Sequence, residues 1–292
     1  MKANEMIDLI QQALHIEPER IQIIERLIGG MSHLTYHITI DSEPHTVRII
    51  GKDGNKFVDR KIEYQNIMII DCLNINHQMV FFDQNTGLKI AKYIKGDVLS
   101  QTDYKPLLPH VVKTLKKLHH SQLIPVNDYG FKARLALYES YLEDLNPTYL
   151  SLKEKWFELY EHVFQFQPKV FCHNDAQQSN MVFANNQMYL LDWEYAGLNP
   201  FYYDIASFGN LSFDHAIELL EAYLGYPPEA YDINSVIYYR MFQALQWHLV
   251  AAYKDRIHLS DVLKFDFNAL AKKYIDLAQT LFNRLKETTW NT

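Results

Sequence analysis

Cysteine is scarce in this chain. Only Cys72 and Cys172 occur in 292 residues, and neither lies in a CxxC or Cys/His cluster. Disulfide frameworks and structural zinc sites need several closely spaced cysteines or histidines, so we predict neither. Two isolated thiols fit a reducing compartment, and we expect a cytoplasmic protein.

An excess of positive charge is also absent. The sequence has 28 Lys and Arg against 35 Asp and Glu, which gives a formal net charge of -7. Proteins that bind nucleic acid usually carry a basic face that contacts the phosphates. We therefore expect no nucleic-acid partner.

Long apolar runs without polar residues are missing as well. The longest apolar stretch, residues 236–253, contains Arg240, Gln243, Gln246 and His248. Because such side chains are costly in lipid, this stretch predicts a buried helix and no membrane insertion. The N-terminal sequence MKANEMIDLI predicts an amphipathic helix rather than a signal peptide.

Aromatic residues, in contrast, are abundant. The chain has 20 Tyr, 16 Phe and 4 Trp, and the aromatic share is 14%. This composition is typical of a ring-rich core, and it also fits a pocket whose rings bind a flat or cationic ligand. Composition alone leaves both interpretations open.

The first third of the chain has short strand patterns around one helix. The strands are predicted from period-2 alternation bounded by turn residues, and the helix from an apolar face at helical spacing. The predicted strands are residues 21–27, 35–40, 45–50, 79–82 and 88–93, and the predicted helix is residues 56–74.

The remaining sequence is mainly helical in pattern. One extended segment, residues 170–191, is interrupted by Asn185-Asn186. The predicted helices are residues 104–120, 133–145, 152–166, 213–224, 233–254 and 260–286. With a boundary near residue 94, we predict an α+β fold with an N-terminal lobe over residues 1–94 and a helical C-terminal lobe over residues 95–292.

The most polar motif of the chain lies inside the extended segment. Asp175 and Asn180 lie in a polar loop between apolar flanks, and Asp192 follows the apolar residues 188–191. Magnesium prefers hard oxygen ligands, which Asn180 and Asp192 can supply. Asp175 then remains to accept a hydroxyl proton. A single Asp or Asn in a loop is usually a turn or cap residue, but three beside buried strands favour a site.

These motifs carry a family resemblance. The segments HNDAQQSNMVF and LLDWEYAG resemble the HxDxxxxN and DxE signatures of the choline kinase and aminoglycoside phosphotransferase family, and bacterial choline kinases most of all. The resemblance implies a bilobal protein-kinase-like fold, with an antiparallel sheet and one helix in the N-terminal lobe. It also implies that Asp175 is the base and that Asn180 and Asp192 bind Mg²⁺. His173 directly follows an apolar strand, and we expect it to be a structural hydrogen-bonding residue rather than a proton-transfer group.

Four N-terminal segments resemble the family's nucleotide-binding parts. The segment Ile28–Tyr36 resembles its nucleotide loop GGMTNxxY, with Gly29, Gly30, Ser32 and His33 near the phosphates, although His33 replaces a common Asn. The other three, residues 47–51, 59–64 and 89–96, imply further contacts with ATP. Arg48 is expected to bind phosphate, Glu63 to pair with Arg48 or to lie in solvent, and Tyr93 and Ile94 to bond the purine or pack at the hinge.

The segment after Asp192 resembles the family's acceptor site. The run from Asp192 to Ala206 matches DxEYxGxNxxxxDxA. It implies that Glu194, Tyr195, Tyr202 and Trp247 surround a cationic head group, the rings by cation–π contact. We also expect Asp204 to cap the following helix and to brace the catalytic loop.

Two departures from the family pattern concern the acceptor. Leu211 stands where relatives carry an acid, and Val250 replaces the second Trp of a WxxW pattern. We therefore predict a kinase that uses ATP and Mg²⁺ to phosphorylate choline or a similar amino alcohol. Ethanolamine, thiamine or an aminoglycoside is the alternative acceptor, and a catalytically silent nucleotide-binding regulator is the alternative class. We expect a monomer or homodimer.

Overall fold

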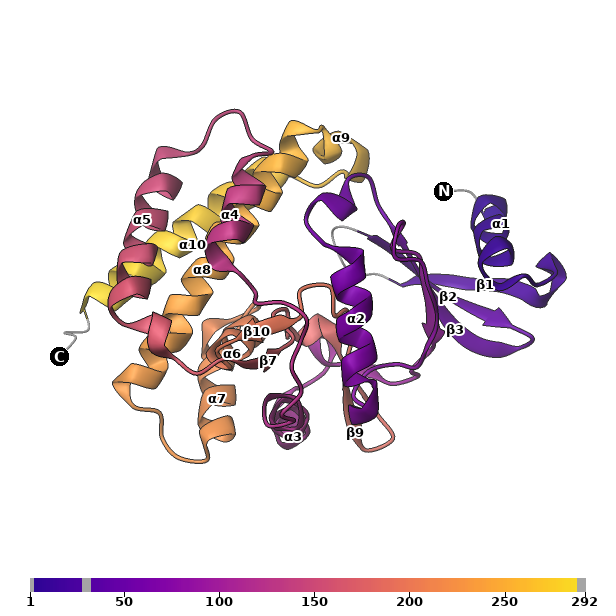
Figure 1. Ribbon diagram of the computed structural model, residues 1–292, viewed down its shortest axis with the longest axis horizontal. Helices are drawn as coiled ribbons and strands as arrows, with labels where there is room; N and C mark the ends of the chain where they lie inside the picture. Colours follow the sequence, from indigo (N-terminus) through magenta and orange to yellow (C-terminus); the bar gives the residue numbers. More distant parts are fainter. Residues whose placement is uncertain (1–2, 28–32, 288–292) are drawn as a thin grey trace. The chain divides into compact units, whose positions relative to one another are not determined.

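The computed structural model describes residues 3–27 and 33–287 (Figure 1). The predicted loop residues Gly29, Gly30 and Ser32 lie outside these ranges. Contacts divide the chain into two compact units. The first unit contains the residues up to Asn127 together with Gln178–Ala196, and the second contains Asp128–Gln177 and the residues from Gly197 onward. This division does not test the lobe boundary predicted near residue 94.

The first unit is built on an antiparallel five-stranded sheet in the order β1-β2-β3-β5-β4. Its strands are β1 (Ile21–Leu27), β2 (His33–Ile40), β3 (Glu43–Ile50), β4 (Met79–Phe82) and β5 (Lys89–Lys92). Asp41 and Ser42 connect β2 to β3 with φ angles of 51° and 66°. Two left-handed residues in a two-residue turn match the right-handed twist of the strands.

One N-terminal helix packs on this sheet. Helix α1 (Ala3–Leu14) buries Met6 and Ile10 against a cluster that includes Ile38, Val47 and Ile90 of the sheet. Its apolar residues recur at helical spacing, so one face turns toward the strands. The predicted amphipathic N-terminal helix is therefore confirmed.

Helix α2 (Arg60–Ile70) is shorter than predicted at both ends. It begins after Asp59, whose carboxylate accepts hydrogen bonds from the backbone N–H groups of Lys61 and Ile62 at 2.9 and 3.2 Å. Such a cap satisfies amides that the first helical turn leaves unpaired. A 3₁₀ turn at Asp71–Leu73 then ends the helix.

The first unit also contains a small three-stranded sheet in the order β6-β8-β9. Its strands are β6 (Asp97–Val98), β8 (Met181–Ala184) and β9 (Gln187–Leu190), and helix α3 (Leu108–His119) bonds to it through Thr114 Oγ1, which donates to the Met188 carbonyl at 3.0 Å. The predicted extended segment 170–191 is therefore divided. Only its second half forms this hairpin, and a 3₁₀ turn at Gln178–Asn180 precedes it.

The second unit is mainly helical, with one pair of short strands. Strand β7 (Val170–Cys172) pairs with β10 (Gly197–Asn199). The helices are α4 (Phe131–Glu139), α5 (Pro147–His162), α6 (Tyr202–Phe208), α7 (Phe213–Leu224), α8 (Ala230–Arg256), α9 (Leu259–Leu263) and α10 (Phe267–Glu287). Helix α6 was not predicted, because it is too short to show a helical period. The predicted helix 260–286 is divided into α9 and α10.

Two of the predicted helices are shifted along the chain. Helix α4 ends at Glu139 rather than 145, and α5 begins at Pro147 rather than 152. Asn146 accepts from the N–H groups of Thr148 and Tyr149 at 2.8 and 3.3 Å, so it caps α5. Proline after a capping asparagine is a strong helix start, and the apolar pattern alone did not reveal it.

Helix α8 forms the centre of the second unit. Arg240, Gln243 and His248 are all buried on it, which confirms the prediction of a buried helix. No helix within the described ranges is long and apolar enough to cross a membrane. The rings of Trp156 and Tyr238 stack there at 4.4 Å between centroids, so a ring-rich core accounts for part of the aromatic content.

Candidate active site

The loop that carries Asp175 is held in place by hydrogen bonds to a buried carboxylate. The backbone N–H groups of His173 and Asn174 donate to the two carboxylate oxygens of Asp204 at 2.9 and 2.7 Å. Asn174 has a left-handed φ of 64°, a conformation that asparagine adopts more readily than most residues. The predicted bracing role of Asp204 is confirmed.

The predicted capping role of Asp204 is wrong. Asp204 lies inside the first turn of α6, whose N-cap residue is Phe201. Its carboxylate is used by the loop after β7 instead. Because carboxylates accept from several N–H groups at once, one fully buried side chain can bind two consecutive amides.

Side chains within the loop add further constraints. Asn199 Nδ2 donates to Asn174 Oδ1 at 2.7 Å, and His173 Nδ1 accepts from the Asp175 N–H at 3.2 Å. His173 is fully buried, so its structural role agrees with the prediction. Asp175 is half-buried, and its Oδ2 accepts from Gln177 Nε2 at 3.1 Å.

Asn180 and Asp192 lie at the same end of the β8–β9 hairpin. Met181 pairs with Leu190, and the Leu191 N–H donates to the Asn180 carbonyl at 2.8 Å. The hairpin therefore brings together two positions that are twelve residues apart in the sequence. Asp192 has a φ of 68°, which turns the chain sharply at the end of the strand.

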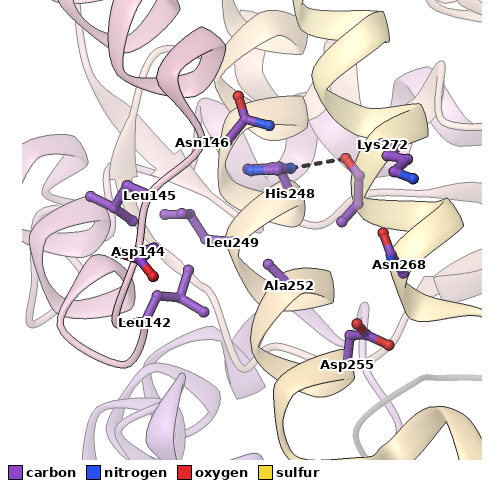
Figure 2. A pocket seen from close by; sticks show the side chains of 11 residues that line it. Leu142, Asp144, Leu145, Asn146, His248, Leu249, Ala252, Asp255, Asn268 and Lys272 are labelled. Carbon is purple, nitrogen blue, oxygen red and sulfur yellow. Dashed lines mark hydrogen bonds between the residues drawn. The ribbon is translucent and has the colours of Figure 1, made fainter.

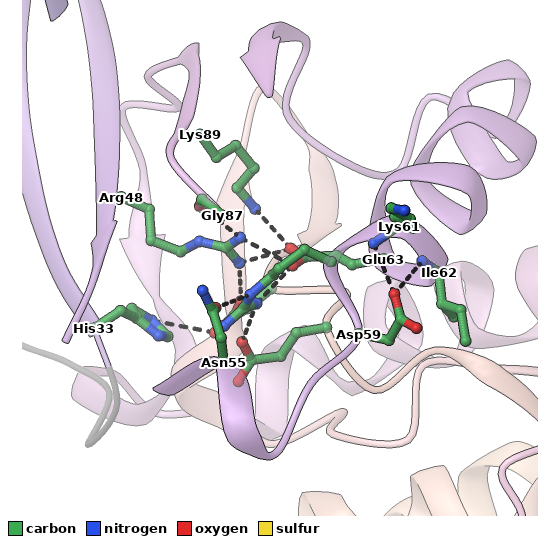
Figure 3. A network of polar contacts seen from close by, with 12 residues as sticks. His33, Arg48, Asn55, Asp59, Lys61, Ile62, Glu63, Gly87 and Lys89 are labelled. Carbon is green, nitrogen blue, oxygen red and sulfur yellow. Dashed lines mark hydrogen bonds and ion pairs between the residues drawn. The ribbon is translucent and has the colours of Figure 1, made fainter. Parts of the chain in front are cut away.

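Arg48 is the centre of a buried ion-pair network in the first unit (Figure 3). It binds both carboxylate oxygens of Glu63, at 2.6 and 2.9 Å, and Asp192 Oδ1 at 3.0 Å. Glu63 is fully buried, so the alternative of a solvated helix charge is excluded. A two-pronged arginine–carboxylate contact fixes both side chains in one orientation.

Two further cations complete this network, and sequence reasoning missed both. Arg60 Nη1 binds Glu63 at 2.6 Å and Glu194 at 2.8 Å, and Lys89 Nζ lies 3.9 Å from Glu63. Three cations thus face three carboxylates. The sequence does carry a signal for Arg60: it lies three residues before Glu63 on one helix, and this spacing brings two side chains together.

Lys89 lies directly opposite Arg48 in the β3–β5 pair. Like charges at such positions repel, and Glu63 between them compensates. Burial lowers the pKa of Lys89 to about 8, and Arg48 lowers it too, against the opposing effect of Glu63. Burial acts to raise the pKa of Glu63, but Arg48 and Lys89 outweigh it, so the carboxyl stays ionised.

Asp192, one of the two predicted metal ligands, lies in a group of side chains that could hold a cation. One ligand atom from each of His33, Asp192 and Glu194 lies within 4.8 Å of the others. Burial acts to raise the pKa of Asp192, but His33 and the neighbouring cations outweigh burial and lower this pKa. The carboxylate is therefore available in its charged form. The two carboxylates match the ligand chemistry of Mg²⁺, and Asn180 as a second ligand stays a prediction.

The predicted purine-binding residues lie between β5 and β6. Tyr93 and Ile94 are both half-buried. The Tyr93 ring stacks on His37 at 4.1 Å between centroids, and its N–H donates to the Pro44 carbonyl at 3.1 Å. Packing therefore explains the position of Tyr93, and purine recognition stays a prediction.

The predicted acceptor residues belong to both units. Glu194 and Tyr195 lie in the first unit, where Arg60 binds Glu194 and Tyr195 is buried. Tyr202 and Trp247 lie in the second. The Tyr202 hydroxyl donates to Asp232 Oδ1 at 2.6 Å, and Trp247 is half-buried on α8. An aromatic wall for a cation stays a prediction.

A surface pocket of about 230 Å³ opens elsewhere in the second unit (Figure 2). It lies between the segment before α5, helix α8 and helix α10, and Asp144, His248, Asp255 and Lys272 contribute its polar lining. His248 Nδ1 donates to the Ala271 carbonyl at 2.9 Å. The residues predicted for the active site do not line this pocket.

Comparisons with known proteins agree with these features. A family model described as choline/ethanolamine kinase matches residues 24–219. The protein LicA of Haemophilus influenzae is 27% identical over 207 residues, which cover 67% of this chain and 61% of LicA. The chain thus matches less than two thirds of that relative's length.

Two solved structures share the fold. A choline/ethanolamine kinase family protein from Mesorhizobium loti has a TM-score of 0.78 at 20% identity, and the match covers 96% of this chain and 95% of that one. The choline kinase LicA from Streptococcus pneumoniae has a TM-score of 0.77 at 20% identity, with 94% and 99% covered. These neighbours confirm the predicted α+β, protein-kinase-like fold class.

Proposed function

The chain belongs to the choline/ethanolamine kinase family, and on this basis we propose that it transfers the γ-phosphate of ATP to the hydroxyl group of choline or a similar small amino alcohol. Membership makes it a small-molecule kinase, a phosphotransferase that acts on an alcohol group. The observation that carries the proposal beyond the family is the buried network in which Arg48 contacts both Glu63 and Asp192.

The first unit supplies the groups that bind the nucleotide. Arg48 presents a charged fork to phosphate, and Glu63 holds that fork in place. Asn180 and Asp192 would hold Mg²⁺, and Glu194 lies beside Asp192. The metal supplies charge neutralisation for the phosphoryl group, as in other enzymes that transfer phosphate. Gly29, Gly30, Ser32 and His33 contribute the phosphate loop.

Asp175 is the base in the second unit. The acceptor hydroxyl gives its proton to the Asp175 carboxylate as the oxygen attacks the γ-phosphate, and ADP leaves. Asp204 fixes the loop by binding the two amides just before Asp175. A rigid loop matters here because catalysis of phosphoryl transfer is mostly positioning and charge stabilisation.

Glu194, Tyr195, Tyr202 and Trp247 bind the amine end of the acceptor. Trp247 is half-buried, whereas its neighbours on α8 are buried. This exposure favours a ring that a ligand can contact. Leu211 stands where relatives carry an acid, and its apolar side chain, which is 62% exposed, has no charge to offer a cationic group. Ethanolamine, which carries a smaller ammonium group than choline, is therefore the second acceptor to test.

The proposed location rests on the use of ATP and on the unpaired thiols. A kinase that uses ATP works where ATP is made. Both cysteines are unpaired, which fits a reducing compartment. We place the protein in the cytoplasm, as a monomer or homodimer.

A panel of acceptors tests the proposed function. Purified protein is mixed with ATP and Mg²⁺ and with choline, ethanolamine, thiamine or an aminoglycoside, and ADP release is measured. We expect choline or ethanolamine to stimulate ADP release most. Nucleotide binding without stimulation by any acceptor would instead support a catalytically silent regulator.

A further inference from the structure

A line of hydrogen bonds in the second unit connects a buried arginine to the proposed base. Arg240 Nη2 donates to Asn210 Oδ1 at 3.0 Å, and Asn210 Nδ2 donates to Gln177 Oε1 at 2.8 Å. Gln177 Nε2 then donates to Asp175 Oδ2 at 3.1 Å. The line joins helix α8, the turn after α6 and the loop after β7.

The direction of these hydrogen bonds is determined by the arginine. A guanidinium has donors only, so Asn210 must present its oxygen to Arg240 and its NH₂ group to Gln177. Gln177 must then present its oxygen to Asn210 and its NH₂ group to Asp175. A single orientation of each amide side chain therefore makes all three hydrogen bonds possible.

Arg240 is itself fixed in the core. It is 5% exposed, and its Nη1 donates to Gln243 Oε1 at 3.1 Å. Gln243 in turn donates to the Tyr203 carbonyl at 2.9 Å and to Ser207 Oγ at 2.8 Å. Burial lowers the pKa of Arg240, and nearby groups that include Asp175 oppose that shift. The guanidinium stays protonated at neutral pH.

We propose that Arg240 and Asn210 are positioning residues that fix the amide of Gln177, so that its NH₂ group holds the Asp175 carboxylate ionised and in one rotation. A hydrogen bond donated to a carboxylate favours its charged form, which is the form that accepts a proton. Supporting contacts of this kind set the precision of a catalytic group. The inference rests on the proposed function, because it assumes that Asp175 is the base.

Asn210 offers the sharpest test, since it is exposed and its replacement leaves the core intact. Asn210→Asp keeps an acceptor for Arg240 but loses the donor to Gln177. Gln177 then turns its NH₂ group toward the new carboxylate and its oxygen toward Asp175, which repels the base. Asn210→Ala removes both contacts and leaves Gln177 unrestrained.

The variants Asn210→Asp and Asn210→Ala should rank in one order by kcat and in the opposite order by melting temperature. We expect Asn210→Asp to lower kcat at least about tenfold and more than Asn210→Ala does, because misplaced catalytic groups cost rate steeply. The melting temperature of Asn210→Asp should equal or exceed that of Asn210→Ala, because Asp keeps a contact with Arg240. KM for ATP should not change. A purely structural role of Asn210 would lower kcat and melting temperature together.

Asn283→Asp is the matched control. Asn283 is also exposed and also bonds to a glutamine side chain, although here its Oδ1 accepts from Gln279 Nε2 at 3.0 Å. Its replacement makes the same change of charge on α10, so kcat should equal that of the wild type. A kcat for Asn210→Asp within twofold of this control would overturn the proposal.

Asp175→Asn separates the two hypotheses. If Asp175→Asn is inactive while Asn210→Asp works normally, the base assignment stands and the positioning role is wrong. If Asp175→Asn retains near-normal kcat, the base assignment is wrong, and the positioning role is wrong with it. Loss of turnover in both variants, with the stability order given above, supports the positioning role.

Discussion

Glu63 and Arg48 form a two-pronged ion pair, with oxygen-to-nitrogen distances of 2.6 and 2.9 Å, in which the glutamate is fully buried. Arg60 and Lys89 approach the same carboxylate. Removal of Glu63 would leave three buried cations facing each other. The pair therefore serves both the stability of the first unit and the orientation of Arg48.

Glu63→Gln should destabilise the protein and weaken ATP use. Loss of one partner from a buried ion pair typically costs about 3–5 kcal/mol, because the remaining charge stays buried. KM for ATP should rise, since Arg48 loses its orientation. Urea unfolding and a titration with ATP measure the two effects. Glu143→Gln, which removes a surface partner of Arg256, is the control and should change neither. Unchanged urea unfolding in Glu63→Gln would contradict this account.

Asp175→Asn should keep nucleotide binding and lose turnover. The amide has nearly the shape of the carboxylate but cannot accept the hydroxyl proton. We expect kcat to fall at least about a hundredfold, which is the usual scale for a general base. Steady-state kinetics with the best acceptor and binding of ATP by calorimetry measure the two quantities. Wild-type kcat in this variant would show that Asp175 is not the base.

Asp192→Asn should weaken the binding of Mg²⁺ together with the nucleotide. The carboxylate is a strong ligand for a hard cation, and an amide oxygen is a weaker one. The Mg²⁺ concentration needed for half-maximal activity should therefore rise. Titrations of ATP at several Mg²⁺ concentrations measure this shift, with Asp214→Asn on α7 as a control of equal charge change. The same Mg²⁺ requirement in both variants would exclude Asp192 as a ligand.

His248 should make the second unit sensitive to acid. Burial lowers the pKa of His248 below its ordinary value of 6.5, so the folded protein keeps the ring neutral where the unfolded chain protonates it. Above pH 6.5 both forms are neutral and the effect is absent. As pH falls below 6.5 the unfolded state binds more protons, and the free energy of unfolding falls.

His248→Asn tests this effect, because Asn can donate to the Ala271 carbonyl without titrating. Its urea midpoint should decrease less than that of the wild type between pH 7.5 and pH 5.5. His162→Asn, at the exposed end of α5, is the control and should follow the wild type. Equal pH slopes in all three proteins would show that His248 does not contribute.

Some spatial relations within the candidate site follow from local motifs. Polar residues beside apolar strands pointed to Asp175, Asn180 and Asp192, whereas Arg48 was expected from the family resemblance of its strand. A hairpin brings the ends of its two strands together whatever the rest of the fold does, so Asn180 and Asp192 had to be neighbours. Helix ends were less predictable: Asn146 caps α5, whereas Asp204 lies inside the first turn of α6.

The sequence by itself determined the strands of the first unit, the buried character of α8 and the types of residue that carry phosphoryl-transfer chemistry. Only the tertiary structure decided the partners of those residues. Arg60 and Glu194 are 134 positions apart, and Arg240 and Asn210 are 30 apart. Local periodicity records which face a side chain occupies, whereas packing between distant segments decides which charge or amide it meets.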